Sequence, residues 1–433
     1  MKKGDIMNPD IAKWQKQLVK CIRCGTCRSV CPIFQFEDNE NTTARGKVKL
    51  LESVSDGKLD LTPALQERLF KCLMCKACAA GCPSGVKTDE LFLNARKTLV
   101  KKNGLPLLKK IAFTGLRFRR FFDLGLRMGA TFQNLVLKDA PGGRGKQPRI
   151  PIPAAGFDTR RIIPTMADKP LRRQLPSVNS VAAPKARVAF FTGCMLNYMY
   201  PEAGKALVRV LNHNGIEVVI PEEQCCCGTP AFTSGDQETG QFLAEHNINV
   251  LAAGNYDAII TGCATCGSAL KLEYGEIISD ATLQKKWEAL SEKVYDITTY
   301  LLKIGYDTDF GPVKATVTYH DPCHLVRSMG VSKEPRQIMK NIPGLIFQEM
   351  KEADKCCGSG GTFNLAHYEL SRKINDLKLN NAEATGAEIL VTGCSACRMH
   401  IADGLNQRDS NMKVVHTAEI IDRAYQSAKK GGK

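Results

Sequence analysis

Eighteen of the nineteen cysteines of this 433-residue chain lie in two kinds of motif, and these are the residues whose types and spacing could do chemistry. The first kind occurs twice near the N-terminus, as three cysteines at intervals of three followed by a cysteine next to proline. The copies are CIRCGTCRSVCP, with Cys21, Cys24, Cys27 and Cys31, and CLMCKACAAGCP, with Cys72, Cys75, Cys78 and Cys82. Cysteines at this spacing wrap a tight loop around one face of a [4Fe–4S] cluster, so the motif indicates electron transfer.

In motifs of this kind the cysteine beside the proline commonly ligates the cluster of the other motif. We therefore predict a cluster 1 held by Cys21, Cys24, Cys27 and Cys82, and a cluster 2 held by Cys72, Cys75, Cys78 and Cys31. Zinc sites are built from paired CxxC knuckles, and two full copies of the longer spacing argue against zinc. A purely structural role for the clusters is an alternative, but two neighbouring clusters favour a path for electrons.

The second kind of motif occurs twice in the C-terminal half and contains a CCG tripeptide. The first CCG site consists of Cys194, Cys226, Cys227, Cys263 and Cys266, and the second of Cys323, Cys356, Cys357, Cys394 and Cys397. Adjacent cysteines cannot easily occupy separate corners of one cubane, and they suit a site where thiolates bridge irons. We predict a metal cluster in each copy; buried structural thiols and a thioredoxin-like pair are the alternatives. Cys225 lies outside both patterns and is interpreted as a packing or spare thiol.

Three histidines, His320, His324 and His400, lie beside motif cysteines. Such residues are more often hydrogen-bonded loop groups than ligands, and ligation or a hydrogen bond to sulfur are the functional alternatives. The sequence shows no GxGxxG after a strand, no Ser–His–Asp arrangement and no paired carboxylates, so it identifies no catalytic residue. A chain of clusters without a hydride or substrate centre should receive its electrons from another polypeptide.

The elements that position the second kind of motif form an internal repeat. In each half a β-rich run leads into the first cysteine, VAFFTGC and TVTYHDPC, and a later strand ends in TGCxxC. Strands alternating with helices of this length predict parallel α/β units. The cysteines then follow the carboxyl ends of strands, where open parallel sheets present binding loops. The predicted fold class is a helical two-cluster domain followed by two tandem α/β CCG domains.

The distribution of cysteines predicts five segments. We expect a ferredoxin-type domain over residues 1–102, a basic amphipathic helical segment over 103–138, a proline-rich linker over 139–186, and CCG domains over 187–312 and 313–433. The amphipathic segment has two interpretations: a pair of helices that covers the ferredoxin-type domain, or a surface for a membrane or a partner. The eight prolines after it predict an extended linker that straps other parts together.

Charge and composition limit the partners. The formal charge is +16, although each cluster with four thiolates contributes about −2. A basic remainder suits an acidic partner or anionic lipid, and without a nucleic-acid motif we expect no nucleic-acid partner. No apolar run reaches the roughly 18–20 residues of a spanning helix. The start of the chain has no signal-peptide pattern, so we expect a reducing cytoplasmic location, with peripheral contact to the cytoplasmic face of the membrane.

Together these motifs resemble a known family. A twin-cluster ferredoxin domain joined to two CCG domains resembles the iron–sulfur subunit of glycolate oxidase, and related subunits of respiratory D-lactate and anaerobic glycerol-3-phosphate dehydrogenases share the layout. The resemblance covers nearly the whole chain, least well in the proline-rich linker. It is carried by CIRCGTCRSVCP, ARGKVKLL at 44–51, CLMCKACAAGCPSGV, HDPC at 320–323 and CCGSGGTF at 356–363.

The resemblance implies a partner subunit that carries FAD and oxidises a 2-hydroxy acid, glycolate or D-lactate. This chain would then act as the iron–sulfur subunit of the enzyme and pass electrons to quinone or another membrane acceptor. It would hold two [4Fe–4S] clusters in the N-terminal domain and one or two further iron–sulfur clusters in the CCG domains.

The catalytic subunit of heterodisulfide reductase shares the layout, and there a complete five-cysteine motif holds a noncubane [4Fe–4S] cluster that cleaves a disulfide. Both motifs are complete here, whereas glycolate oxidase subunits often have an incomplete last CxxC. Cys394 and Cys397 are therefore a departure from that branch, which favours clusters in both CCG domains and leaves a reductase-like function open.

Overall fold

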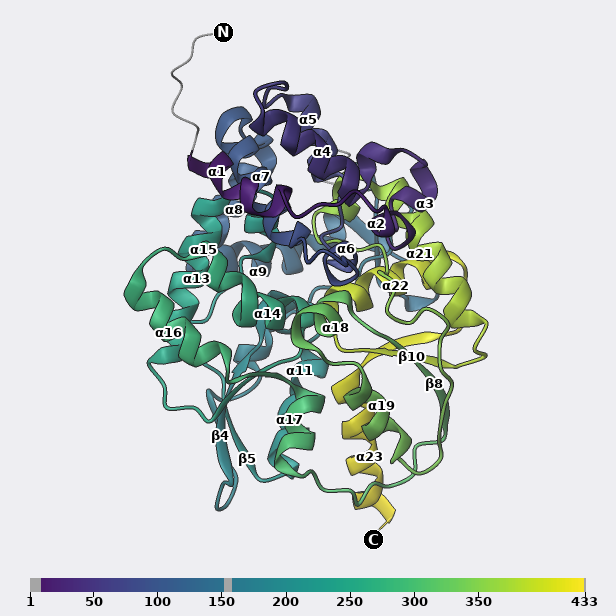
Figure 1. Cartoon of the computed structure of the whole chain (residues 1–433). Helices are drawn as coiled ribbons and strands as arrows, with labels where there is room; N and C mark the ends of the chain where they lie inside the picture. The colour runs from purple at the N-terminus through teal and green to yellow at the C-terminus, as the bar shows by residue number, and fades with distance from the viewer. Residues whose placement is uncertain (1–8, 152–157, 432–433) are drawn as a thin grey trace.

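A helical N-terminal region and two α/β units make up the described part of the chain, residues 9–151 and 158–431 of this computed structural model (Figure 1). Residues 1–8, where the sequence predicts no signal peptide, lie outside the described part, as do residues 152–157 of the proline-rich segment. The predicted fold class is confirmed, because helices come first and two sheets of parallel strands follow. Within the described ranges, no helix is both long enough and apolar enough to span a bilayer.

Short helices frame the two N-terminal cysteine motifs. They are α1 (Pro9–Leu18), α2 (Thr26–Ser29), α3 (Phe34–Glu37), a 3-10 turn η1 (Glu40–Thr42), α4 (Ala44–Ser55), α5 (Pro63–Phe70), α6 (Ala77–Ala80) and α7 (Thr88–Asn103). Thr43 and Thr62 cap α4 and α5, because their side-chain oxygens accept backbone N–H groups of the first helical turn. Trp14, Leu51 and Phe92 are buried in the core between these helices.

The first CCG unit is a five-stranded sheet in the order β3-β5-β4-β6-β7. Its strands are β3 (Val178–Asn179), β4 (Ala186–Phe191), β5 (Ile216–Val219), β6 (Ala258–Thr261) and β7 (Val294–Asp296), parallel except for β3. Its helices are α10 (Gly193–Tyr198), α11 (Pro201–His213), α12 (Thr229–Thr233), α13 (Gln237–Ala252), α14 (Ala264–Ser268), a π-helical turn (Ala269–Glu273), α15 (Tyr274–Ile277), α16 (Ala281–Ser291) and α17 (Ile297–Ile304).

The second CCG unit repeats this topology with four parallel strands in the order β11-β10-β8-β9. The strands are β8 (Ala315–His320), β9 (Leu345–Phe347), β10 (Ile389–Thr392) and β11 (Lys413–His416). The helices are α18 (Cys323–Met329), α19 (Lys333–Lys340), α20 (Phe363–Ala366), α21 (Tyr368–Glu383), α22 (Ser395–Gln407) and α23 (Thr417–Gly431).

The two units pack into one body around a common core. Helix α11 of the first unit packs against α23 of the second, and Arg209 on α11 pairs with Asp422 on α23 at 2.6 Å. Buried side chains of both sheets, among them Phe190 on β4 and Tyr319 on β8, belong to the same apolar cluster. The cysteine-bearing loops of the two units are therefore held in a fixed relation to each other.

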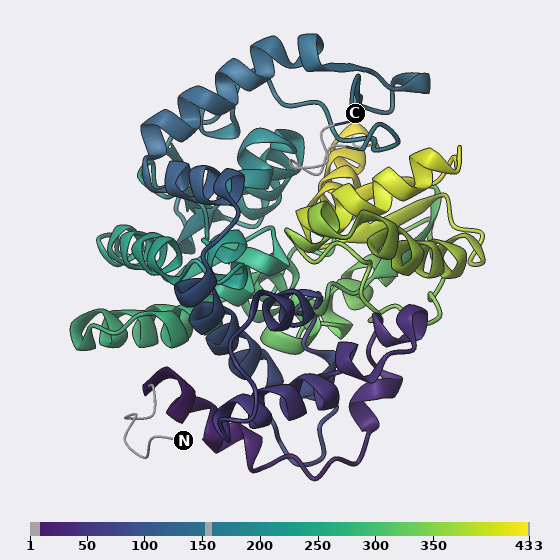
Figure 2. The same cartoon turned by 90° about the horizontal axis from the view of Figure 1, so that it is seen from above.

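Two helices follow the N-terminal region, α8 (Leu107–Arg117) and α9 (Arg119–Val136), and α9 runs along the edge of the molecule in Figure 2. The helix pair that the sequence predicts is present, but α8 packs against α13 of the first CCG unit. The pair therefore packs mainly on the first CCG unit, while Lys109 of α8 also lines a cavity with Phe70 and Cys72 of the ferredoxin-type domain. Helix α8 packs on α13 because Arg117 of α8 pairs with Glu238 and stacks on the ring of Phe242, both on α13.

The proline-rich segment crosses both CCG units. It forms a hairpin of β1 (Leu137–Asp139) and β2 (Lys146–Pro148), with 3-10 turns η2 (Pro141–Gly143) and, further on, η4 (Leu171–Arg173). Arg144 pairs with Asp409 and the N–H of Ile162 donates to Asp403, both in the second unit. Further along, the N–H of Ala167 donates to the carbonyl of Tyr198 in the first unit.

Candidate iron–sulfur centres

Two adjacent hollows in the N-terminal region are lined by cysteines from both motifs. Cys21, Cys24, Cys27 and Cys82 line one hollow, and Cys31, Cys72, Cys75 and Cys78 line the other. These are the groups that the sequence predicts for cluster 1 and cluster 2. Four sulfurs around one hollow fit the ligand requirement of a cubane. Cys78 lines both hollows, so the two sites share a wall.

Basic residues of α4 lie beside these hollows. The guanidinium of Arg45 lines the cluster 1 hollow and donates to the carbonyl of Arg23 at 3.3 Å. Lys47 lines the cluster 2 hollow, is almost fully buried, and donates to the carbonyl of Lys71 at 2.6 Å. Burial lowers the pKa of Lys47, and the neighbouring Cys72 thiol opposes this effect. Position 46, between Arg45 and Lys47, requires glycine, since a Cβ there would lie 2.0 Å from the carbonyl oxygen of Glu40.

The ten CCG cysteines form one continuous series of thiol contacts. Electrostatic interactions between neighbouring thiols connect them in the order Cys194, Cys226, Cys227, Cys266, Cys263, Cys394, Cys397, Cys357, Cys356 and Cys323. The two halves meet at Cys263 and Cys394, whose Sγ atoms are 4.0 Å apart. The structure thus brings all five predicted residues of each site together and joins the two sites.

Parallel strands position these thiols. Cys194 follows β4 and Cys263 follows β6, and Cys323 and Cys394 occupy the same places after β8 and β10. The carboxyl ends of adjacent parallel strands lie at one edge of a sheet, so cysteines distant in sequence converge there. Gly228 and Gly358, the last residues of the CCG tripeptides, have φ of 80° and 92°. This left-handed conformation favours glycine, and it turns the chain away after the paired cysteines.

The thiol contacts prepare some cysteines to bind metal. Hydrogen bonds from Cys226 and Cys266 hold the pKa of the Cys227 thiol well below its ordinary value. Corresponding bonds from Cys356 and Cys397 lower the pKa of Cys357 to about 5. Metals bind the thiolate form. Neighbouring thiols and burial raise the pKa of other cysteines in the same series, Cys226 and Cys266 among them, so it is the convergence of ten sulfurs that fits a metal cluster.

The ferredoxin-type region touches the second CCG site through its cluster 2 loop. Cys31 and Cys75 share an apolar cluster with Cys323 and Cys356. Arg327 on α18 donates to the carbonyl of Cys75 at 3.2 Å. Cluster 2 and the second CCG site are therefore neighbours, although cluster 2 is nearer in sequence to the first site.

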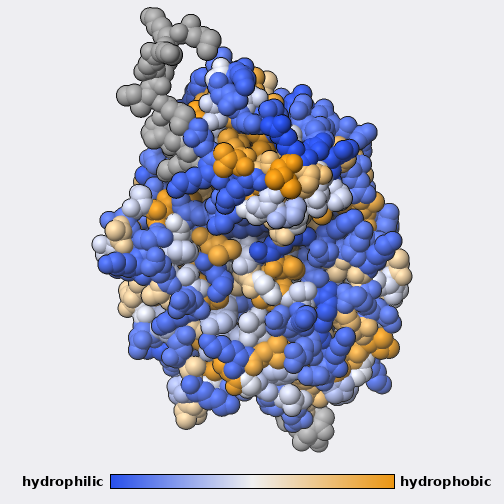
Figure 3. Space-filling model, in the orientation of Figure 1, coloured by the Kyte–Doolittle hydropathy of each residue, from blue (hydrophilic) through white to orange (hydrophobic). Residues whose placement is uncertain are grey.

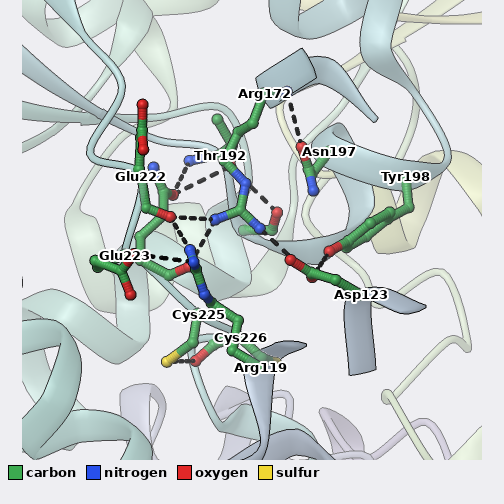
Figure 4. Close-up of polar contacts among 12 residues, drawn as sticks. Arg119, Asp123, Arg172, Thr192, Asn197, Tyr198, Glu222, Glu223, Cys225 and Cys226 are labelled. Carbon is green, nitrogen blue, oxygen red and sulfur yellow. Dashed lines mark hydrogen bonds and ion pairs between the residues drawn. The ribbon is translucent and has the colours of Figure 1, made fainter. Parts of the chain in front are cut away.

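Two arginines hold the loop before the first CCG tripeptide (Figure 4). Arg172 donates to the carbonyl oxygens of Glu222 and Gln224 at 2.9 and 2.8 Å. Arg119, the first residue of α9, donates to the carbonyl of Glu222 and pairs with Glu223 at 3.0 Å. The loop that carries the first paired cysteines is thus fixed by the proline-rich segment and by α9.

Asp123 on α9 joins the same network. It accepts from the hydroxyl of Tyr198 and lies 3.8 Å from the guanidinium of Arg172 (Figure 4). Arg119, Asp123 and Arg172 are not among the site residues that the sequence motifs predict. No local motif marks them, because the partners of these side chains lie 49 to 104 positions away in the chain. The one signal in the sequence was the density of arginine in segments interpreted as a linker and an amphipathic helix.

Cys225 lies outside the series of thiol contacts. Its Sγ contacts Oδ1 of Asn247 at 3.3 Å, and Asn247 also donates to the carbonyl of Cys226. Burial raises the pKa of Cys225 to about 12, which keeps it a protonated thiol in this environment.

All three histidines beside the motifs have protein partners, and Nδ1 of His320 contacts the carbonyl of Ala353 at 3.2 Å. His324 contacts Oγ1 of Thr265 and the carbonyl of Met74. His400 contacts Oγ of Ser371 at 3.0 Å. All three therefore serve as hydrogen-bonded groups in the described structure, as most such histidines do.

A cavity of about 250 Å³ lies between the two CCG sites and the cluster 2 loop. Cysteines of both sites line it, together with Cys72, Met74, Lys109, His324 and His367. Its walls are mostly apolar. A small molecule in this cavity would touch both sets of CCG cysteines.

Family comparisons match the two kinds of cysteine region. The family described as "4Fe-4S dicluster domain" matches residues 17–86. The family described as "Cysteine-rich domain" matches twice, over residues 188–271 and 317–402. These matches support iron–sulfur clusters as cofactors.

Curated relatives align over most of the chain. The "Probable glycolate oxidase iron-sulfur subunit" of Bacillus subtilis is 33% identical over 94% of this chain and 93% of its own length. A dihydromethanophenazine:CoB–CoM heterodisulfide reductase subunit of Methanosarcina barkeri is 27% identical over 94% of each chain. Among solved structures, a hypothetical protein from Helicobacter pylori has a TM-score of 0.55 at 10% identity, and covers 98% of this chain and 75% of that one. This last likeness shows the fold alone.

Proposed function

Because the chain belongs to the family of the glycolate oxidase iron–sulfur subunit, we propose that it is the electron-transfer subunit of a glycolate or D-lactate dehydrogenase complex. In this proposal a partner subunit carries FAD and oxidises the 2-hydroxy acid, and this chain conducts the electrons towards quinone or another membrane acceptor. The observation that carries the proposal is the unbroken succession of cysteine sites from cluster 1 to the first CCG site. Iron–sulfur clusters bound there supply carriers of single electrons.

The positions of the cysteines support one order for the path. Cys78 lies in the wall between the cluster 1 and cluster 2 hollows. Cys75 of cluster 2 lies in the same apolar cluster as Cys323 of the second CCG site. The thiol series then leads through Cys394 and Cys263 to the first CCG site. The proposed path thus reaches the second CCG site before the first, against the order of the chain.

We place the FAD partner beside cluster 1. Cys24 is exposed there, and Val19 and Ile22 on the preceding loop are 82% and 70% exposed. Figure 3 shows apolar side chains gathered on the upper part of this face, over the loop between α1 and α2. An exposed apolar patch at the end of an electron path suits a partner that must come close to the cluster.

Reconstitution with an FAD-containing hydroxy-acid dehydrogenase tests this function. We expect glycolate or D-lactate to reduce the flavin with or without this chain, and to reduce a quinone analogue only when the chain is present. Equal quinone reduction in its absence would overturn the proposal. Iron and sulfide content of the anaerobically purified chain gives the cofactor count: about eight irons for two cubanes and about sixteen if both CCG sites also hold four-iron clusters.

We further propose that α8 and α9 bind the anionic surface of a membrane. Many large apolar side chains of these helices are exposed, including Ile111, Phe121 and Leu135, the last two 73% and 74% exposed. The opposite face of α9, with Ala130 and Gln133, packs on the protein. A surface helix of a soluble protein normally buries its apolar stripe, so this one is available to insert among lipids.

Charge selects anionic lipid as the occupant of this surface. Residues 105–138 contain seven lysines and arginines and a single acidic residue, Asp123. The side chains of Lys110, Arg120 and Arg127 lie on exposed positions beside the apolar stripe. Basic residues beside an apolar face attract lipid headgroups that carry negative charge. Delivery of electrons to a membrane acceptor requires such contact.

Flotation with vesicles tests the surface. We expect the chain to bind vesicles that contain phosphatidylserine and not those of phosphatidylcholine alone, with binding that weakens as salt increases. Phe121→Glu and Leu135→Glu should abolish binding. Ile346→Glu is the matched control, because Ile346 is 56% exposed but lies on β9, outside this surface. Equal binding by all three variants would contradict membrane attachment through α8 and α9.

A second candidate function is reduction of a disulfide in the cavity between the CCG sites. The observation that favours it is the mostly apolar 250 Å³ space with cysteines of both sites in its walls. In the reaction two electrons from the path and two protons would convert one disulfide into two thiols. Activity of the isolated chain on a disulfide with a chemical reductant would favour this function, and no activity with intact clusters would exclude it.

A further inference from the structure

The two CCG sites differ at one structurally equivalent position. The last residue of β4 is Phe191, which pairs in register with Thr261 of β6. The last residue of β8 is His320, which pairs in register with Thr392 of β10. Each lies three residues before the first cysteine of its site. The second site therefore has an imidazole where the first has a phenyl ring.

The hydrogen bonds of His320 define which ring nitrogen carries the proton. Nδ1 lies 3.2 Å from the carbonyl oxygen of Ala353, which also accepts from the N–H of Asp321 and from Nζ of Lys378. A carbonyl oxygen only accepts, so Nδ1 must donate. A neutral imidazole protonated at Nδ1 has a free lone pair on Nε2.

Nε2 of His320 has no hydrogen-bond partner among the described residues, and its side chain is completely buried. A ring nitrogen of His320 and the Sγ atoms of Cys357 and Cys397 lie within 4.8 Å of one another. Metal–ligand bonds of roughly 2.0–2.3 Å place two ligands of one metal up to roughly 4.5 Å apart. Because Nδ1 is engaged by the carbonyl of Ala353, Nε2 is the nitrogen of this group that is free to bind a metal.

We propose that Nε2 of His320 is an iron ligand of the second CCG site. The Nδ1–H bond to a backbone carbonyl is the arrangement that orients metal-bound histidines. Burial of an unpaired nitrogen costs free energy, and a bond to iron satisfies it. Asp321, held by two hydrogen bonds to Arg336 at 2.9 and 2.8 Å, fixes the backbone next to the histidine. The inference rests on the proposed function, because it requires a cluster in the second CCG site.

Mixed ligation would distinguish the sites electronically. Histidine is a neutral ligand, and where the imidazole takes an iron position that a thiolate fills in the first site, it makes the reduction potential less negative. The second CCG site would then be easier to reduce than the all-cysteine first site. Since the second site adjoins cluster 2, it would collect electrons before they pass to the cavity or to the first site.

Nitrogen hyperfine spectroscopy of the holoprotein tests the assignment. The signal of the second site is identified as the one lost in Cys356→Ala. We expect this signal to show coupling to ¹⁴N that changes to the ¹⁵N pattern when the protein contains ¹⁵N-histidine. His320→Phe, which copies Phe191 of the first site, should lose the coupling and shift the midpoint potential downwards. His400→Gln is the matched control, a buried histidine of the same unit whose Nε2 already contacts Ser371, and it should retain the coupling.

The labelled wild-type protein decides the question even if His320→Phe fails to fold. A second-site signal without nitrogen coupling overturns the proposal, and so does coupling that survives in His320→Phe. If Cys356→Ala removes no signal and no iron, the second site holds no cluster and the proposal also fails. In that case intact cubane signals and intact electron transfer to quinone would leave the proposed function standing.

Discussion

The Sγ atoms of Cys263 and Cys394 lie 4.0 Å apart at the point where the two CCG units meet. Each is the first cysteine of a TGCxxC sequence, and the backbone N–H of Ala264 donates to the carbonyl of Gly393 across the same boundary. His416, at the end of β11, adds a 2.6 Å contact to the carbonyl of Gly262. The two CCG sites are therefore parts of one centre rather than separate sites.

Magnetic interaction between the two CCG sites is the first prediction. When both hold paramagnetic clusters, we expect broadened or split EPR signals because their ligands are in contact. Removal of one cluster by Cys356→Ala should simplify the signal of the other. Unchanged line shapes in Cys356→Ala, with loss of iron confirmed by analysis, would show that the sites are farther apart than this geometry requires.

Cys24→Ser should convert or abolish cluster 1 and stop electron flow from substrate to quinone, while the partner flavin is still reduced. Cys24 is the exposed ligand of the cluster 1 hollow, so its loss leaves the apolar core intact. Stopped-flow reduction of flavin and of a quinone analogue measures the two steps. Cys225→Ser is the control, since Cys225 lies outside the thiol series, and it should leave iron content and electron flow unchanged. Full electron flow in Cys24→Ser would contradict the proposed path.

Lys47→Met should make the reduction potential of cluster 2 more negative. The buried ammonium lies in the wall of that hollow, and a nearby positive charge stabilises the extra electron of the reduced cluster. An interaction on the order of 2 kcal/mol at an effective dielectric near 20 corresponds to roughly 90 mV for one electron. EPR-monitored redox titration measures the shift. Lys49→Met, which removes an exposed lysine of the same helix, should leave the potential in place.

Gly358→Ala should destabilise the second CCG unit and empty its site. Gly358 has φ of 92°, and a Cβ there would lie 2.5 Å from the carbonyl oxygen of Ser371. We expect a loss of more than about 3 kcal/mol, since the clash adds to the strain of the left-handed conformation. Thermal unfolding and iron content report the effect. Gly386→Ala isolates the strain alone, because its φ is 66° with open space around the Cβ position, and it should cost about 1 kcal/mol.

Acid should destabilise the protein partly through His400. Burial lowers the pKa of this histidine from 6.5 to about 4, so the folded state binds fewer protons than the unfolded state between these values. The contribution of the neutral His400 side chain to the free energy of unfolding is therefore fully present above pH 6.5 and is lost as the pH falls towards 4. Between pH 7.5 and 5 the loss from this residue is about 2 kcal/mol.

Thermal unfolding of wild type and His400→Gln at both pH values measures this contribution. The variant should lose less stability at pH 5 than the wild type, because the other histidines are the same in both proteins. Equal acid sensitivity of the two proteins would show that His400 is not the group responsible.

The sequence by itself determined the chemistry and the local architecture. Cysteines separated by two or three intervening residues form a cluster-binding loop, because the chain between the ligands is short. The glycine of each CCG tripeptide allows the turn after the paired cysteines. The alternation of short apolar strands with helices was enough to predict parallel sheets. Parallel strands of a repeat then place Cys194 and Cys263, or Cys323 and Cys394, at one sheet edge.

Only the tertiary structure decided which sites are neighbours. The contact of cluster 2 with the second CCG site rests on Cys75 and Cys323, which are 248 positions apart in the chain, and the meeting of Cys263 with Cys394 depends on how the two units share a core. The sequence also did not predict that α8 packs on α13, that Arg172 binds the loop before the first CCG tripeptide, or that Nε2 of His320 lacks a hydrogen-bond partner among the described residues. Such relations arise when the complementary surfaces of whole elements pack, and local residue spacing does not encode that fit.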